Sequence, residues 1–144
     1  MPLQGMDVLN HNLDILSNPE TAVDLALEAG ATVIQANAQR NIRTQGLIEE
    51  GRLRSSIAVI RLASMLFSIG TNVIYAAIHE FGGTIRAKAG KWLRFKTKDG
   101  QWHTVKEVTI PARPYMRPAY RNDQKGIVTA VVRVLKQQLL GRLK

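Results

Sequence analysis

The sequence of 144 residues contains no cysteine. Without thiols the chain can build neither a disulfide framework nor a thiolate zinc site, and it has no thiol nucleophile. It also lacks an uninterrupted apolar run of about eighteen residues, and its N-terminus has neither the basic start nor the apolar centre of a signal peptide. We therefore expect no membrane span and no secretion by a cleaved signal, which leaves the cytoplasm as the default compartment.

Basic residues are missing from the first 30 positions. Five of the 11 acids lie there, whereas all 20 Lys and Arg follow residue 30, and the net charge is +9. This asymmetry favours either a polyanionic partner such as nucleic acid or subunits that meet acidic face to basic face. The length is typical of one domain with one core, so we predict a single domain over residues 1–144 with a flexible segment at 1–16.

A long helix is predicted near the N-terminus. The sequence Ser17-Asn18-Pro19-Glu20 is typical of a helix start, with a serine cap, a proline in the first turn and an acid three residues after the cap. Apolar residues then recur at helical spacing as far as about Ile42. Gly30 lies in the middle of this stripe, where glycine is costly, which indicates close packing against a neighbouring backbone.

The middle of the chain has the alternating pattern of β-strands. Two strands are predicted over 53–59 and 65–69, joined by a short turn. A second hairpin is predicted from 91–97 and 101–110 around Lys98-Asp99-Gly100, because Asp-Gly between β-rich runs is a strong turn signal.

Trp92 and Trp102 are expected to lie near each other across this second hairpin. Three prolines then end the β region, and a last helix is predicted over about 119–143. Together these elements predict an α+β fold, in which a long N-terminal helix packs on a small antiparallel sheet and a C-terminal helix follows.

Histidines do not form a plausible metal site. His79-Glu80 resembles the start of a metalloprotease helix, but that chemistry needs a second histidine four residues after the first, and position 83 is glycine. His11 and His103 fall in other predicted elements. We expect no metal site.

Nucleophilic or metal-assisted catalysis is not indicated either. The serines near the first hairpin have no Gly-x-Ser-x-Gly elbow, and they are expected to be ordinary strand residues: Ser55, Ser56, Ser64 and Ser68. A nuclease would need clustered carboxylates, whereas Asp123 is more simply the cap of the last helix. We therefore predict no catalytic residue, no cofactor and no enzymatic activity.

Cations and aromatic residues interleave over the second hairpin. Such a surface can follow a phosphate backbone and stack bases, although the aromatics can equally be core or subunit contacts and the lysines a solvated face. No helix-turn-helix, zinc-finger or RNP signature is found. The candidate DNA contacts are Arg86, Lys88, Lys91, Arg94, Lys96 and Lys98, with Lys106, Trp92, Phe95 and Trp102 around them.

Four short motifs occur in a defined order between residues 51 and 120. They comprise Gly51, Leu53, Ser56 and Ile57; Gly70, Thr71, Tyr75 and Ala76; Glu80, Phe81 and Gly82; and Pro111, Ala112, Arg113, Pro114 and Tyr115. Over this half of the chain the sequence resembles the tailed-bacteriophage virion morphogenesis proteins, also described as tail-completion or neck proteins. The match departs at Glu50, where a threonine is common in the family.

This resemblance implies a structural subunit that forms a ring at the head-to-tail junction and acts without catalysis or cofactor. Its expected partners are copies of itself, other neck and tail proteins, and DNA passing through the channel; it is made in the host cytoplasm and located in the virion. The expected interface residues are Tyr75, Glu80, Phe81, Arg113, Tyr115 and Arg117.

Residues 72–83 are expected to form a structural corner. We predict a short helix capped by Asn72 and ended by Gly82-Gly83, in which His79 faces solvent and Glu80 is directed toward Arg113. Its inward residues are expected to be Tyr75, Ile78 and Phe81, with Phe81 as the anchor.

Two other functions compete with the structural role. A small basic nucleic-acid-binding module would bind oligonucleotides as a monomer through the second hairpin. A metal-dependent nuclease would require cleavage that depends on Asp123.

Overall fold

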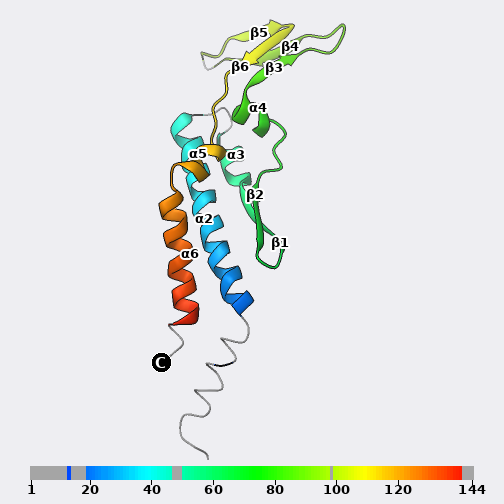
Figure 1. Cartoon of the computed structure of the whole chain (residues 1–144). Coiled ribbons are helices and arrows are strands. Elements are labelled where there is room, and N and C mark those ends of the chain that lie inside the picture. Colours follow the sequence, from blue (N-terminus) through cyan, green and yellow to red (C-terminus); the bar gives the residue numbers. More distant parts are fainter. Residues whose placement is uncertain (1–12, 14–18, 47–49, 98, 141–144) are drawn as a thin grey trace, which may run out of the picture.

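The computed structural model describes residues 13, 19–46, 50–97 and 99–140. It contains helices and short antiparallel strand pairs, so the expected α+β fold class is confirmed (Figure 1). The helices are α2 (Pro19–Gln45), α3 (Glu50–Ser56), α4 (Ala76–Phe81), α5 (Met116–Arg121) and α6 (Gln124–Leu139). The strands are β1 (Ala58–Ala63), β2 (Leu66–Gly70), β3 (Gly83–Arg86), β4 (Leu93–Lys96), β5 (Trp102–Val105) and β6 (Glu107–Ile110).

Helix α2, with 27 residues, is the longest helix described, and α6 runs antiparallel along it (Figure 1). Its predicted start at Pro19 with Glu20 in the first turn is confirmed, while Ser17 lies outside the described residues. A Cβ added at Gly30 would lie 2.7 Å from a methyl carbon of Val131 on α6. The prediction of close packing at Gly30 is therefore confirmed, because only a residue without a side chain lets the two helices approach this closely.

The hydrophobic core is small and lies near the C-terminal end of α2, where α3, α4 and α5 meet. Among the described residues, the largest fully buried side chains are those of Ile42, Leu53 and Ile57. The buried core cluster is Ala38, Ile42, Leu53, Ile57, Val73, Ala76, Tyr115 and Ala119.

The prediction of a strand beginning at residue 53 is wrong, because residues 50–56 form helix α3. Leu53 and Ile57 are both buried and four residues apart, a spacing that suits one face of a helix as well as alternate positions of a strand. The hydroxyls of Ser55 and Ser56 donate to carbonyl oxygens three residues earlier, so they are helical serines.

Strands β1 and β2 form a hairpin that packs along α2. Phe67 and Ile69 lie on the side toward α2, where they line an apolar groove with residues of α2 and α6. Arg61 is tied to Asp24 of α2, which also accepts from the backbone N–H of Met65 in the turn.

Residues 83–110 form an extension at the opposite end of the molecule from the start of α2, which we call the arm (Figure 1). The predicted hairpin around Asp99-Gly100 is confirmed as β4 and β5. The continuous strand expected over 101–110 is instead divided: after Lys106 the chain leaves β4 and pairs as β6 with β3, a partner that we did not predict.

Two further expectations are corrected by this topology. Trp92 and Trp102 lie at opposite ends of the β4–β5 ladder, since Trp102 pairs with Lys96 and Leu93 with Val105. The last helix is broken into α5 and α6, with the Asp123 carboxylate accepting from the Gly126 N–H at 3.2 Å, as expected of a cap.

Candidate assembly surfaces

The Glu80 carboxylate of α4 joins this helix to the start of α5. This side chain is only 9% exposed and accepts hydrogen bonds from three backbone N–H groups, those of Tyr115 at 2.8 Å, Met116 at 2.9 Å and Arg117 at 3.0 Å. These donors stand at the start of α5, where the first N–H groups have no partner within the helix and a negative charge is favoured. Glu80 is thus a capping group for α5 supplied from α4.

The predicted pairing of Glu80 with Arg113 is therefore wrong: no ion pair joins them in the described part of the chain, and both carboxylate oxygens are used by backbone donors. Arg113 instead donates its backbone N–H to the carbonyl oxygen of His79 at 2.7 Å. Asn72 is not the cap either, because α4 begins at Ala76 after Tyr75, which makes no side-chain cap bond.

The orientation predicted for α4 is also corrected. His79 is buried and Phe81 is 67% exposed, so Phe81 does not anchor the corner and His79 does not face solvent. The buried face is formed by Ala76, His79 and Glu80, at helical spacing. Of the residues predicted to turn inward, Tyr75 does pack against the core, whereas Phe81 does not. The expected end of the helix is confirmed, since Gly82 has φ 69° and its added Cβ would lie 2.7 Å from the backbone nitrogen of Ala112.

His79 lies in a recess with Arg113, Thr109 and Ile110. Burial, and secondarily the Arg113 guanidinium, lower the pKa of His79 below its ordinary value. Its ring meets that of Tyr75 edge to face at 5.8 Å between centroids. The neutral imidazole is therefore the form that this corner holds at neutral pH.

An open apolar hollow of about 540 Å³ lies between α4 and α5. Phe81 stands at its rim with the Arg117 guanidinium 5.7 Å from its ring centroid, and Tyr120 of α5 is half exposed beside them. Of the six predicted interface residues, the structure brings Glu80, Phe81, Tyr115 and Arg117 to this hollow. Tyr75 packs against the core and Arg113 lines the separate recess.

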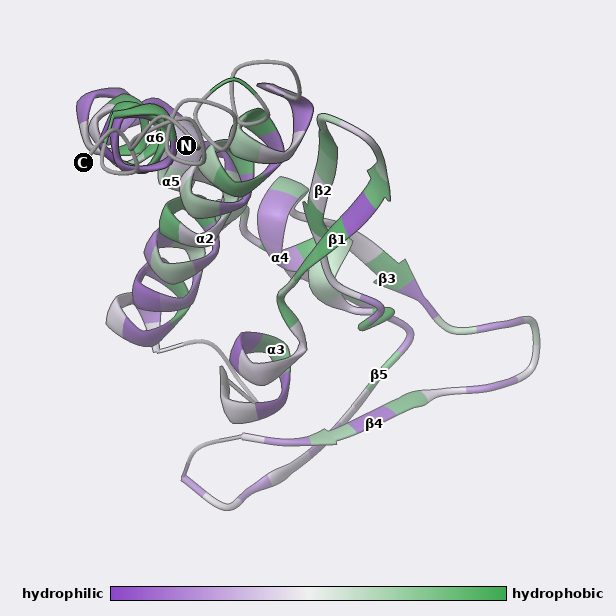
Figure 2. Cartoon of the chain, turned by 90° about the horizontal axis from the view of Figure 1, so that it is seen from below, coloured by the Kyte–Doolittle hydropathy of each residue, from purple (hydrophilic) through white to green (hydrophobic). Residues whose placement is uncertain are grey.

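The outward side of the β1–β2 hairpin is a second exposed apolar surface. Ile60 and Leu62 alternate on β1 and are 52% and 62% exposed. Figure 2 shows the largely hydrophobic colouring of this hairpin. In the part of the chain that the structure describes, β1 and β2 pair only with each other, so each strand has one edge without a strand partner there.

The β4–β5 ladder of the arm has two different faces, and Figure 2 shows hydrophilic and hydrophobic residues alternating along β4. On one side Phe95 stacks on His103 at 5.9 Å between centroids, next to Leu93 and Val105. The other side, which we call the basic–aromatic face, consists of Trp92, Arg94, Lys96, Trp102, Thr104 and Lys106.

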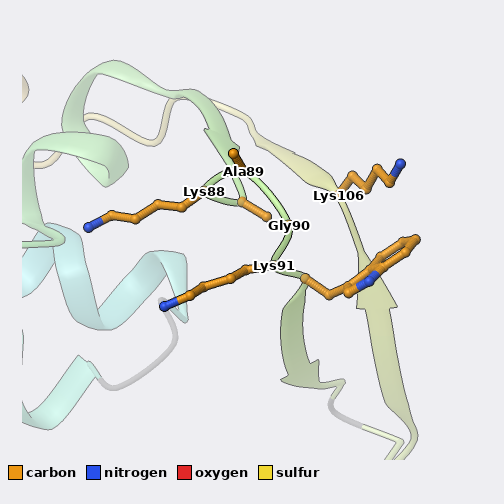
Figure 3. Close-up of a pocket in the computed structure, with 7 residues that line it drawn as sticks. Lys88, Ala89, Gly90, Lys91 and Lys106 are labelled. Atoms are coloured by element: carbon orange, nitrogen blue, oxygen red, sulfur yellow. The ribbon is translucent and has the colours of Figure 1, made fainter.

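The predicted DNA contacts do not all belong to this face. Arg86 is paired with Glu107 at 3.1 Å, and Lys98 lies outside the described residues. Lys88 and Lys91 extend to the same side from the loop between β3 and β4, while Lys106 extends away from them (Figure 3). The hollow of about 420 Å³ between these lysines is therefore not a cradle for a single anion.

Within the described ranges, no group of three or more His, Asp or Glu side chains is placed to hold a metal ion. None of the helices described is both long and apolar enough to cross a membrane.

The described residues thus form a small α+β fold with separate exposed apolar and basic surfaces. The profile of the phage virion morphogenesis family matches residues 28–140, and the chain belongs to this family. The family indicates a structural role in phage virion assembly and a location in the virion.

One similar curated protein comes from Methanocaldococcus jannaschii and is named only as uncharacterized. It is 28% identical over 97 residues, which cover 65% of this chain and 56% of that protein. This chain thus spans a little over half of that relative's length. No solved structure matches the chain.

Proposed function

We propose that this protein is a structural, non-enzymatic component of the phage head-to-tail junction, of the neck or tail-completion type, that assembles into a ring. Family membership supports the virion role. The observation that carries the assembly is the presence of two exposed apolar surfaces, the α4–α5 hollow and the outward side of β1–β2, on a subunit whose core contains few large side chains.

The two surfaces differ in shape and belong to different elements. A contact between the hollow of one subunit and the hairpin of the next is heterologous, and repetition of a heterologous contact closes into a ring when the rotation allows it. Burying Phe81 and Leu62, which are 67% and 62% exposed, contributes to such an interface about 25 cal/mol for each Å² of apolar area removed from water.

The test uses one charged substitution in each surface, Phe81→Asp and Leu62→Asp, with Val128→Asp as the matched control. Val128 is 59% exposed on α6, away from both surfaces. Light scattering after size-exclusion chromatography should show ring-sized assemblies for the wild type and the control, and monomers for each surface variant.

Mixing the two defective variants makes the test sharper. Each variant retains the surface that the other has lost, so a heterologous contact predicts a heterodimer that grows no further. Monomers in the mixture would contradict the pairing of these two surfaces. A wild-type chain that remains monomeric as the protein concentration is raised would contradict self-assembly into a ring.

A further inference from the structure

The basic–aromatic face of the arm carries cations without acidic partners. Among the described residues of the arm the acids are Asp99, in the turn, and Glu107, which is already paired with Arg86. No ion pair in the described ranges involves Arg94, Lys96 or Lys106. Three neighbouring positive charges therefore point to solvent without compensation, which is the electrostatic signature of a surface for a polyanion.

The two tryptophans of this face position two of its three cations. The Arg94 guanidinium lies 4.7 Å from the centroid of the Trp102 ring, and the Lys106 ammonium lies 5.1 Å from that of Trp92. Such contacts orient a cation at little cost in hydration. Because each indole already has a cation over one side, the rings act as supports for charge more than as free platforms for bases. This arrangement favours contact with phosphates over base stacking.

The dimensions of the face suit a phosphate backbone. From Trp92 to the Lys96–Trp102 pair the ladder rises four residues, or about 13 Å. A length of about 13 Å along B-DNA contains about four phosphates of each strand. The major groove of B-DNA is wide enough to admit a two-stranded ribbon of this kind.

We propose that the basic–aromatic face binds the phosphate backbone of duplex DNA without reading its sequence. The proposal goes beyond the structural role above and does not rest on it, since an isolated subunit presents the same face. Arg94, Lys96 and Lys106 contact phosphates, and Trp92 and Trp102 position two of these cations.

Intrinsic fluorescence provides a local signal for the test, because the chain contains two tryptophans and both lie on this face. The full-length protein is titrated with a duplex of mixed sequence at salt concentrations from 50 to 200 mM. Release of counterions by three cations predicts a slope of log K against log[salt] of about −2.7, which is an affinity loss of about 40-fold over this range. A single-stranded oligonucleotide of equal length should bind more weakly.

The decisive variant is Arg94→Gln/Lys96→Gln/Lys106→Gln, which keeps both tryptophans. Its matched control is Lys125→Gln/Arg133→Gln/Lys136→Gln, which removes the same charge from exposed positions of α6. The arm variant should lose about tenfold or more in affinity at 50 mM salt and lose most of the salt dependence. The control should retain both, which separates this face from the general effect of a net charge of +9.

Several results would overturn the proposal. They are no binding at 50 mM salt, equal losses in the arm and control variants, or tighter binding of single strands that disappears in Trp102→Leu. Light scattering on the same samples distinguishes this failure from that of ring assembly. If the arm variant changes the oligomeric state and leaves DNA affinity intact, the face binds an acidic surface of another subunit and the DNA proposal is wrong.

Discussion

Replacement of Glu80 by glutamine removes one negative charge from the link between α4 and α5. In the native protein one carboxylate oxygen accepts from the N–H groups of Tyr115 and Met116, and the other accepts from that of Arg117. Glutamine can keep an oxygen toward the first two donors, but its NH₂ group then meets the third donor. The variant therefore loses one hydrogen bond and the charge assistance of the other two.

The expected loss follows from these three bonds. A hydrogen bond to a charged group contributes about 1.5–3 kcal/mol, and bonds to one carboxylate are not additive. We expect Glu80→Gln to lower the free energy of unfolding by about 2 kcal/mol. Glu80→Ala should lower it by about 4 kcal/mol, because it leaves all three donors without this acceptor. At about 3–4 °C per kcal/mol for a domain of this size, the melting temperature should fall by about 7 °C and 14 °C.

Urea unfolding at two protein concentrations measures these losses and separates folding from association. Hydrogen exchange adds a local measurement, since the amides of Tyr115, Met116 and Arg117 should lose protection in Glu80→Gln before the amides of α2 do. Two controls are Arg113→Gln and Glu107→Gln, each expected to change stability by less than about 0.5 kcal/mol. Wild-type stability in Glu80→Ala, or a loss in Arg113→Gln as large as in Glu80→Gln, would refute the capping role.

Three further predictions concern packing, pH and backbone conformation. Gly30→Ala should lower the free energy of unfolding by about 1 kcal/mol, since the new Cβ would lie 2.7 Å from a Val131 methyl carbon. In a Val131→Ala background the same substitution should be stabilising, because the helix propensity of alanine is gained without the clash. Circular dichroism melts of the wild type, the two single variants and the double variant measure this. Burial lowers the pKa of His79, so below about pH 6.5 the unfolded chain binds a proton more readily than the folded one. Stability should therefore fall as pH falls from 7.5 to 5, and His79→Gln should show a smaller fall in melting temperature over this range. Gly82→Ala should cost about 2 kcal/mol or more in urea unfolding, because φ there is 69° and the new Cβ would lie 2.7 Å from a backbone nitrogen; unchanged stability would show that the turn adjusts freely.

Sequence patterns predicted the long elements well because their signals are local. Helix α2 has a proline and an acid in its first turn and a periodic apolar stripe, and the hairpin around Asp99-Gly100 is specified by its turn. The close packing at Gly30 could be predicted from a local signal as well, since a glycine within a helical apolar stripe lowers helix stability unless close packing requires it. The error at Leu53 and Ile57 arose because a spacing of four residues is compatible with both a strand and a helix.

The errors within the site have a different cause. The features that were mispredicted there depend on contacts between residues distant in sequence. Glu80 lies 35 residues from its first backbone donor, at Tyr115, and nothing local to either position indicates the pairing. The division of β5 from β6 depends on β3, which pairs with the second half of the predicted strand; even the closest pair, Arg86 and Glu107, is 21 residues apart in sequence. The position of Lys106 beside Trp92 could have been predicted from the sequence, because the turn closed by Thr97 and Gln101 fixes the register of the β4–β5 ladder.

The geometry separates the predicted interface residues into two groups with different consequences for assembly. Glu80 and Tyr115 are 9% and 3% exposed, and their contacts are internal, so substitutions there change assembly by changing the fold around α5. Phe81 lies at the surface, and Arg117 beside it contributes its side chain to the rim of the hollow. A loss of assembly in Phe81→Asp with unchanged urea unfolding therefore indicates an interface. The same loss in Glu80→Gln, accompanied by a lower free energy of unfolding, shows only that the hollow needs the α4–α5 link to keep its shape.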